Sequence, residues 1–305
     1  MPRLVQTIKK SYKEIVTLAL LFAITLFAHA LVAGTWLASD ELAVWVFDID
    51  QGDAIFIDAP NAQILIDGGP NGDVVQKLSA VMPFWDRSID VVVSTHPHAD
   101  HVTGLIDVLE RYDVGEVWST GQDYETEVYS YFQSFDLPPF QGGIEGGSGE
   151  GLFRLVSAGY QIDLGNGATL RVAWPESSLN HQFFEDPNDG SIVLMLEYGE
   201  TSILLTGDIG IAQEQAILDS MQDIDVLKVG HHGSIMSSEA DFLEVIDPEY
   251  SIISVGENDY GHPSPIILDR FRSIGSQVLR TDLDGDVRVL SNGGEPDIST
   301  WHLSP

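Results

Sequence analysis

The sequence predicts a mixed α/β (α+β) fold, an αββα sandwich preceded by one N-terminal transmembrane helix. Apolar strand patterns recur through two successive halves of the chain, amphipathic helix patterns are interspersed among them, and an uncharged apolar segment precedes both halves. With 305 residues, the chain is long enough to bury a large core. We therefore expect a basic cytoplasmic tail at 1–14, a membrane segment at 15–37 and a folded domain at 40–298.

The membrane segment at 15–37 contains no Asp, Glu, Lys or Arg. At about 1.5 Å per helical residue, it is long enough for a bilayer core of about 30 Å. Basic residues between Arg3 and Lys13 precede it and acidic residues follow it, which favours an N-terminus inside the cell and the remaining chain outside. The Ala-His-Ala motif at 28–30 resembles a signal-peptidase site, so a cleaved, secreted form is the alternative. We favour the uncleaved anchor because the apolar run continues past this motif.

Strands and helices follow in a regular order. In the first half we expect strands at 43–47, 54–57, 63–66 and 91–94, with helices at 74–82, 102–112 and 124–135. A glycine-rich loop at 138–151 follows, and strand patterns resume at Phe153. In the second half we expect strands at 169–173, 192–197, 202–206, 226–229, 250–254, 277–280 and 286–290, with helices at 212–220, 242–245 and 265–273.

The composition is strongly acidic, with a formal net charge of −33 and no cysteine. Such a surface repels polyanions at long range. It indicates either adaptation to a salty medium, in which screening shortens the electrostatic range, or a substrate other than nucleic acid. The lack of cysteine excludes disulfides and thiolate metal sites, so histidine and carboxylate are the available metal ligands.

One short segment carries the strongest signal for chemistry. His96, His98, Asp100 and His101 fall within six consecutive residues, directly after the apolar strand expected at 91–94. A rigid strand end followed by a helix is a suitable support for a pre-organised metal site. Imidazoles and a carboxylate suit zinc, and also manganese or iron. The sequence therefore predicts a metal centre at this strand end.

This segment resembles the His-x-His-x-Asp-His signature of the metallo-β-lactamase superfamily. Further motifs narrow the resemblance to the hydrolase domain of ComEC-type DNA-internalisation (competence) proteins and its free-standing relatives. These motifs occur in the expected order: Asp48-Ile49-Asp50-Gln51-Gly52-Asp53, Asp67-Gly68-Gly69, Thr206-Gly207-Asp208, His231-His232-Gly233-Ser234 and Tyr260-Gly261-His262-Pro263. The resemblance covers about 42–290 and implies a metallo-β-lactamase αββα sandwich for the domain at 40–298.

The resemblance implies two divalent cations, zinc or manganese, with magnesium as a further candidate. Under this interpretation the first cation is held by His96 and His98, the second by Asp100, His101 and His232, and Asp208 bridges them. Successive residues at a strand end point to opposite sides, so we expect only one of His231 and His232 to be a ligand. The resemblance assigns His232 as the metal ligand and places His231 toward the substrate. The reverse assignment stays open.

The remaining candidates are assigned to catalysis and substrate binding. The catalytic candidates are Asp67, Asp100, His231 and His262. By resemblance, Asp67 orients a ligand histidine or the attacking water. His262 would donate to a substrate phosphate or protonate the leaving group, and its alternative is a structural loop histidine. Ser234 is expected to contact phosphate at a helix start.

Two positions depart from the related families. Asn188 stands near the place where many superfamily members supply a further histidine, although ComEC-type domains share an Asn-x-x-Ser pattern there. This weakens the first cation site and favours manganese or magnesium over tightly bound zinc; we expect Asn188 to face the substrate. Asp50 replaces the usual glycine of its motif, so it is expected to need a left-handed backbone.

Together these features predict a membrane-anchored, extracytoplasmic, metal-dependent phosphodiester hydrolase, most simply a DNA nuclease. One apolar segment leaves no room for a channel, so a role in DNA uptake would need a separate channel protein as partner. The first alternative is a small-molecule metallo-hydrolase acting on a lactone, a β-lactam or a phosphocholine ester. The second is a non-catalytic accessory of DNA uptake.

Overall fold

The computed structural model describes residues 13, 15–27, 41–135 and 153–302. It contains two compact units, Met1–Asp40 and Glu41–Pro305. In the first unit, residues 15–27 are helical. Within the described ranges, we find no helix with the length and hydropathy that a bilayer crossing requires. The rest of the expected membrane segment, 28–37, lies outside the described residues, as does the glycine-rich loop at 138–151.

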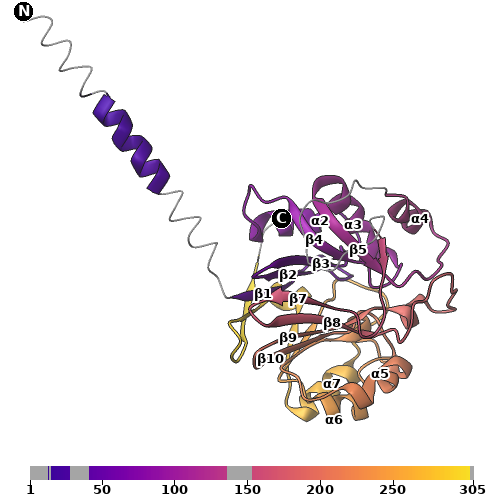
Figure 1. The fold of residues 1–305 in the computed structure, drawn as a ribbon. Helices are drawn as coiled ribbons and strands as arrows, with labels where there is room; N and C mark the ends of the chain where they lie inside the picture. The colour runs from indigo at the N-terminus through magenta and orange to yellow at the C-terminus, as the bar shows by residue number, and fades with distance from the viewer. Residues whose placement is uncertain (1–12, 14, 28–40, 136–152, 303–305) are drawn as a thin grey trace, which may run out of the picture. The chain divides into compact units, whose positions relative to one another are not determined.

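The second unit consists of two β-sheets packed face to face, with helices on their outer faces (Figure 1). Over the described residues, the first sheet has eight strands, in the order β15 (Asp297–Trp301), β14 (Asp286–Ser291), β1 (Leu42–Val46), β2 (Ile55–Ala59), β3 (Ala62–Ile66), β4 (Ser88–Val93), β5 (Asp113–Ser119) and β6 (Phe153–Leu155). The second has seven, in the order β13 (Gln277–Arg280), β12 (Tyr250–Ile253), β11 (Val226–Lys228), β10 (Thr201–Leu205), β9 (Val193–Tyr198), β8 (Ala168–Trp174) and β7 (Gln161–Gly165).

Helices cover the outer face of each sheet (Figure 1). The first sheet is covered by α2 (Asp73–Val81), α3 (Ala99–Arg111) and α4 (Glu127–Gln133), and the second by α5 (Ile211–Ile217), α6 (Ala240–Ile246) and α7 (Pro265–Ile274). The shorter turns of helix are η1 (Pro187–Gly190), η2 (Leu218–Ser220), η3 (Gly230–Gly233) and α8 (Thr281–Asp284). This is the αββα sandwich that the sequence predicts.

The central strands are apolar on both faces because each sheet is buried on both sides. In β4, Val91 and Val93 join the core between the sheets, whereas Val92 packs under the helices of the first sheet. In β10, Ile203 and Leu205 face the core between the sheets, and Leu204 faces the outer helices. This double burial anchors both strands, so their carboxyl ends form rigid supports for the residues that follow.

The structure corrects the expected elements in four respects. Strands β5, β7 and β15 were not predicted, because polar residues and glycine break their alternation. The helix expected at 124–135 is shorter and spans Glu127–Gln133. The C-terminal strands return to the first sheet, where β14 pairs with β1 in an antiparallel register, so the two sheets are not simply the two halves of the chain. Strand β15 also extends beyond residue 298, at which we expected the domain to end.

Candidate metal centre

The predicted ligands gather where strand ends from both sheets meet. His96 and His98 follow β4, Asp208 follows β10 and His232 follows β11. Helix α3 begins at Ala99, three residues earlier than expected, so Asp100 and His101 lie in its first turn. Three strand ends and one helix therefore hold the cluster, which restricts the positions that the side chains can take.

His96 and His98 approach each other on one side of the cluster. The Nε2 atom of His96 lies 3.1 Å from Nδ1 of His98, and 3.9 Å from Oδ2 of Asp208. Two imidazole nitrogens that face each other beside a carboxylate form a suitable partial ligand set for a divalent cation.

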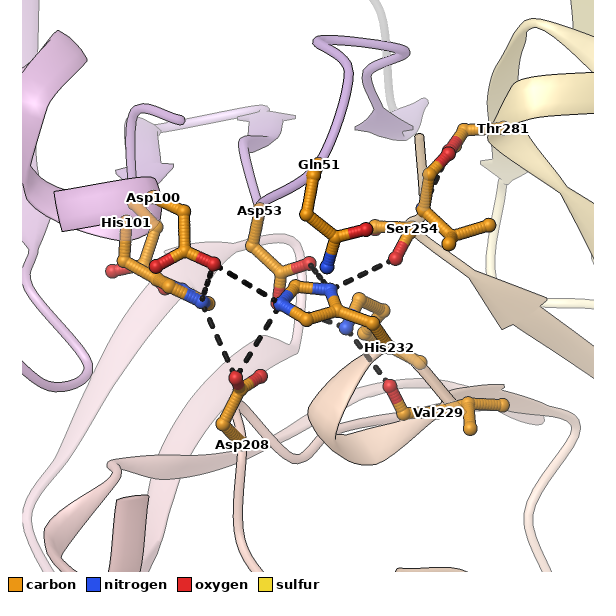
Figure 2. A network of polar contacts seen from close by, with 12 residues as sticks. Gln51, Asp53, Asp100, His101, Asp208, Val229, His232, Ser254 and Thr281 are labelled. Atoms are coloured by element: carbon orange, nitrogen blue, oxygen red, sulfur yellow. Dashed lines mark hydrogen bonds and ion pairs between the residues drawn. The ribbon is translucent and has the colours of Figure 1, made fainter. Parts of the chain in front are cut away.

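Asp208 lies between this pair and a second group of ligands. Its Oδ2 is 3.4 Å from Nε2 of His101 and also 3.4 Å from Nε2 of His232. The Oδ2 of Asp100 completes the second group, 3.6 Å from Nε2 of His232 and 3.9 Å from Nε2 of His101. Figure 2 shows these side chains converging on a common space, with Asp208 opposite Asp100. The structure thus brings together all six residues that the sequence proposed as ligands.

The atoms that face this space fit divalent cations. His101 Nε2, Asp208 Oδ1 and His232 Nε2 are buried and have no hydrogen-bond partner. Leaving a buried polar atom unpaired costs about 1–3 kcal/mol, so several unpaired atoms aimed at one point call for a ligand that satisfies them. Two overlapping groups, His96/His101/Asp208 and Asp100/His101/His232, each offer ligand atoms within 4.8 Å of one another.

The charge of the cluster also favours cations. Burial would raise the pKa of Asp208, but His232 and His101 outweigh this effect and hold the pKa well below its usual value. The pKa of Asp100 is lowered in the same way: burial would raise it, but the nearby rings of His232 and His101 exceed this effect. Both carboxylates are therefore ionised at neutral pH, which is the form that binds metal.

The histidines divide into two kinds. Burial, followed by the proximity of His101, lowers the pKa of His96, so its imidazole is neutral and ready to bind a cation. Burial would also lower the pKa of His101, but Asp208 and Asp67 reverse the shift and raise it. The pKa of His232 is likewise raised, because Asp208 and Asp100 exceed the effect of burial. The second group of ligands thus favours positive charge, which protons or a metal ion can provide.

Asp67 acts on the cluster through His101. Its Oδ2 accepts a 2.8 Å hydrogen bond from Nδ1 of His101, which turns Nε2 of that ring toward Asp208. Asp67 is fully buried and also accepts hydrogen bonds from the backbone N–H and the hydroxyl of Thr95. It orients a candidate ligand, as expected, and it lies behind the ring on the side away from Asp208.

The structure separates His231 from His232 for a different reason from the one expected. Both have left-handed backbones, with φ of 49° and 52°, because η3 turns sharply after β11 rather than continuing the alternation of a strand. His232 points into the cluster, and its Nδ1 lies 2.9 Å from the carbonyl oxygen of Ser254 (Figure 2). His231 points away toward Asn188. This geometry favours His232 as the candidate ligand.

A buried ion pair behind His232 was not assigned by the sequence analysis. Lys228 Nζ lies 2.8 Å from Asp53 Oδ2, and Asp53 Oδ1 lies 3.7 Å from Nδ1 of His232. A side chain at Gly52 would collide with the carbonyl of Asp100, so glycine permits the loop that carries Asp53 to approach the centre. The available signal for this pair was Lys228 itself, because it ends a strand whose other residues are apolar and which is buried on both faces.

Ser191 is a second residue whose position the sequence analysis left unassigned. Its Oγ accepts a hydrogen bond from the backbone N–H of Asp208 at 3.2 Å, and the residue is fully buried. Ser191 is the serine of the Asn-x-x-Ser pattern, which now has a structural explanation. The pattern links the turn that contains Asn188 to the backbone of the candidate bridging carboxylate.

His262 and Asn188 lie beside His231 at the edge of the centre. The His231 and His262 ring centroids are 5.7 Å apart, and Asn188 Nδ2 is 3.4 Å from His231 Nε2. Burial, with His231 and His232 nearby, lowers the pKa of His262, so its neutral form predominates at neutral pH. A neutral imidazole can accept a proton at one ring nitrogen and donate a hydrogen bond from the other, so the expected role of His262 as an acid remains a prediction.

Two local expectations have definite outcomes. No helix begins at Ser234: it follows η3, its Oγ accepts a hydrogen bond from the N–H of Met236, and α6 begins only at Ala240. The expected helix start at Ser234 is therefore wrong, whereas a contact between Ser234 and a phosphate remains a prediction. Asp50 does have the expected left-handed backbone, with φ of 69°, and its Oδ1 accepts a hydrogen bond from the N–H of Glu257.

Comparison with known proteins now identifies the family. The model of the metallo-beta-lactamase superfamily matches residues 48–257, which include all six candidate ligands. The chain belongs to the metallo-beta-lactamase superfamily. Members of this superfamily are generally metal-dependent hydrolases, and the cluster described above is the candidate metal site of this member.

Curated relatives confirm the resemblance to ComEC-type competence proteins. The chain is 29% identical over 275 residues to ComE operon protein 3 of Bacillus subtilis (strain 168), covering 82% of this chain and 33% of that protein. It is also 29% identical over 264 residues to Competence protein ComA of Neisseria gonorrhoeae, covering 84% of this chain and 33% of that protein. The chain thus spans about one third of the length of these relatives.

A solved structure supports the fold. The metallo-beta-lactamase fold protein YhfI from Bacillus subtilis aligns with a TM-score of 0.56 and 11% sequence identity, covering 83% of this chain and 100% of that one. This likeness concerns the arrangement of the sheets and helices.

Proposed function

We propose that this chain is a metal-dependent phosphodiesterase and that its polymeric substrate is DNA. The observation that carries the proposal is the position of Asp208, whose Oδ2 faces His96 on one side and both His101 and His232 on the other. His96 and His98 would hold one cation. Asp100, His101 and His232 would hold a second cation, and Asp208 would bind both. When bound, such a pair lowers the pKa of a water molecule and neutralises phosphate oxygens.

The remaining residues would position the ligands and the substrate. Asp67 orients His101, and Ser191 fixes the backbone of Asp208. His231, His262 and Asn188 lie together beside the centre, where they would contact a phosphodiester by hydrogen bonds. The lowered pKa of His262 suits acceptance of a proton from an attacking water.

The relatives favour DNA over a small molecule. Proteins named for competence and recombination share up to 29% identity with this chain over most of its length. The net charge of −33 opposes a polyanion at long range, and bound cations would offset that repulsion only at the centre. The proposal therefore predicts that hydrolysis of DNA becomes faster as salt screens this repulsion.

A substrate panel tests this proposal. The purified protein should hydrolyse bis-p-nitrophenyl phosphate and single- or double-stranded DNA in the presence of Mn²⁺, Mg²⁺ or Zn²⁺. It should leave a β-lactam, a lactone and a phosphocholine ester intact. Turnover of one of these small substrates without any phosphodiester cleavage would replace this proposal with the first alternative. No turnover of any substrate would favour the non-catalytic accessory.

We further propose that residues 15–37 anchor the protein in a membrane with the hydrolase domain outside the cytoplasm, where it would act with a channel protein in DNA uptake. The uncharged segment and the preceding basic cluster support this orientation. A reporter fused after Pro305 should be active only outside the cytoplasm. Release of intact protein by a carbonate wash, or a mature N-terminus at Leu31, would contradict the anchor.

A further inference from the structure

We propose that bases of a single-stranded nucleic acid stack on two exposed aromatic rings beside the metal centre, Phe183 and Tyr260. The inference rests on the proposed function for the identity of the substrate. It specifies how an acidic protein would hold a polyanion: through the faces of the bases rather than through its phosphates.

Tyr260 is exposed, yet the loop that carries it is well ordered by hydrogen bonds. Its side chain is 77% exposed, and its ring stacks on His262 at a centroid distance of 5.9 Å and an interplanar angle of 23°. Asn258 secures this loop: its Oδ1 accepts from the N–H groups of Tyr260 and His262, and its Nδ2 donates to the carbonyls of Gly256 and His262. An exposed ring on a pre-organised loop loses little conformational entropy on binding.

Phe183 lies beside the chain segment that contacts His98. Its side chain is 72% exposed, and its backbone pairs with Asp123 in an isolated β-bridge. Tyr124, the residue after Asp123, places its ring against His98 at a centroid distance of 5.7 Å. Phe183 is therefore linked to His98 through the Asp123–Tyr124 segment, and Tyr260 is linked to His231 through His262.

Most cationic side chains of the described residues are already engaged by other groups of the protein. Within the described ranges, Lys228 is buried against Asp53, and Arg270 donates to the carbonyls of Ser237 and Ser238. Ion pairs with carboxylates also engage most of the other cationic residues there: Lys77, Arg111, Arg154, Arg272 and Arg280. Electrostatic capture of phosphates by lysine and arginine, the usual source of affinity for nucleic acids, is therefore weak in this protein.

Binding through the faces of the bases favours single-stranded over double-stranded nucleic acid. In a duplex, the faces of the bases are stacked on one another and unavailable to protein side chains, whereas a single strand exposes them. Stacking also tolerates any base sequence, because every base has a π face. A substrate that spans both rings would hold a phosphodiester over the metal centre between two stacked bases.

Binding of an uncharged, uncleavable strand tests the proposal without depending on hydrolysis. The probes are a fluorescein-labelled thymidine decamer with methylphosphonate linkages and an abasic decamer with the same linkages, measured by fluorescence anisotropy on the full chain. We expect the thymidine strand to bind at least about tenfold more tightly, which corresponds to one stacked base. Phe183→Ala and Tyr260→Ala should each reduce this preference by about fivefold or more, whereas Tyr260→Phe should preserve it.

Phe84→Ala is the matched control. Phe84 is 83% exposed but packs against Trp85 in the loop between α2 and β4, away from the residues of the centre. The Phe84→Ala variant should bind the thymidine decamer and the abasic decamer with the same affinities as wild type. Equal affinity for the two decamers, including no measurable binding of either, would overturn the stacking proposal even if the protein hydrolyses DNA. A preference for thymidine without any hydrolysis would retain stacking and refute the proposed function.

Discussion

Lys228 and Asp53 form a buried ion pair directly behind His232. The Nζ of Lys228 lies 2.8 Å from Asp53 Oδ2 and 2.9 Å from the carbonyl oxygen of Val229. Asp53 Oδ1 lies 3.7 Å from Nδ1 of His232 (Figure 2). Neither charged side chain reaches solvent to any extent. The pair therefore couples the stability of the domain to the position of a candidate metal ligand.

Removal of one partner should destabilise the protein strongly. Lys228→Met leaves the carboxylate of Asp53 buried without its counter-charge, which costs about 3–5 kcal/mol of the free energy of unfolding. Urea denaturation monitored by circular dichroism measures this loss. The double variant Lys228→Met/Asp53→Leu should regain part of the stability, because it buries no unpaired charge. Loss of less than about 1 kcal/mol in the single variant would contradict this account of the pair.

A second buried carboxylate should make stability depend on pH. Burial raises the pKa of Glu214 to about 7, although the N–H groups of Ser238 and Glu239 donate to it. Its folded-state pKa is above the unfolded value of 4.5, so the contribution of this group to stability is fully present below about pH 4.5. The contribution is lost as pH rises through about 7, by up to about 3 kcal/mol.

The Glu214→Gln variant isolates this effect. Glutamine does not ionise, so the stability of the variant relative to wild type should increase as pH rises from about 4.5 to about 8. Urea denaturation midpoints across this pH range measure the difference in stability between the variant and wild type. The contributions of the other titrating groups cancel in this difference. Asp241→Asn, at an exposed position of α6, should show no such trend. Parallel stability curves for Glu214→Gln and wild type would refute the raised pKa.

Salt should accelerate the hydrolysis of DNA. With a net charge of −33, the protein repels a polyanion until monovalent salt screens that repulsion. We expect kcat/KM on DNA to rise between low salt and about 0.5 M at fixed divalent metal, and the rate on a small phosphodiester to change much less. A basic nuclease behaves oppositely, because salt competes with its phosphate contacts. Thermal unfolding measured at each salt concentration separates this effect from a gain in stability.

Most of the fold and of the candidate site could be predicted from local sequence. Strands buried on both faces, such as β4 and β10, are continuous apolar runs, and the candidate ligands follow them directly. The order of the motifs predicted that Asp208 and His232 would join the cluster although more than 100 residues separate them from His96. The assignment of these residues as ligands remains a prediction.

Non-local pairing could not be predicted in the same way. Nothing in the alternation of β14 indicates that it pairs with β1, a contact across almost the whole domain. The left-handed turn at His231 and His232 contradicts the strand alternation used to separate them, because η3 redirects the chain. Asp53 was visible in its motif, but its role depends on Lys228, which only the folded structure brings beside it.

The most direct test of the account is the hydrolysis of bis-p-nitrophenyl phosphate during a Mn²⁺ titration of the metal-free protein, in wild type and in Asp208→Asn. The substitution preserves the shape of the side chain and removes the charge that would be shared by both cations. We predict metal-dependent turnover by wild type and a loss of more than about tenfold in the variant, with circular dichroism unchanged. Turnover in the presence of chelator, or a variant that keeps more than about a tenth of the wild-type rate, would contradict the two-cation centre.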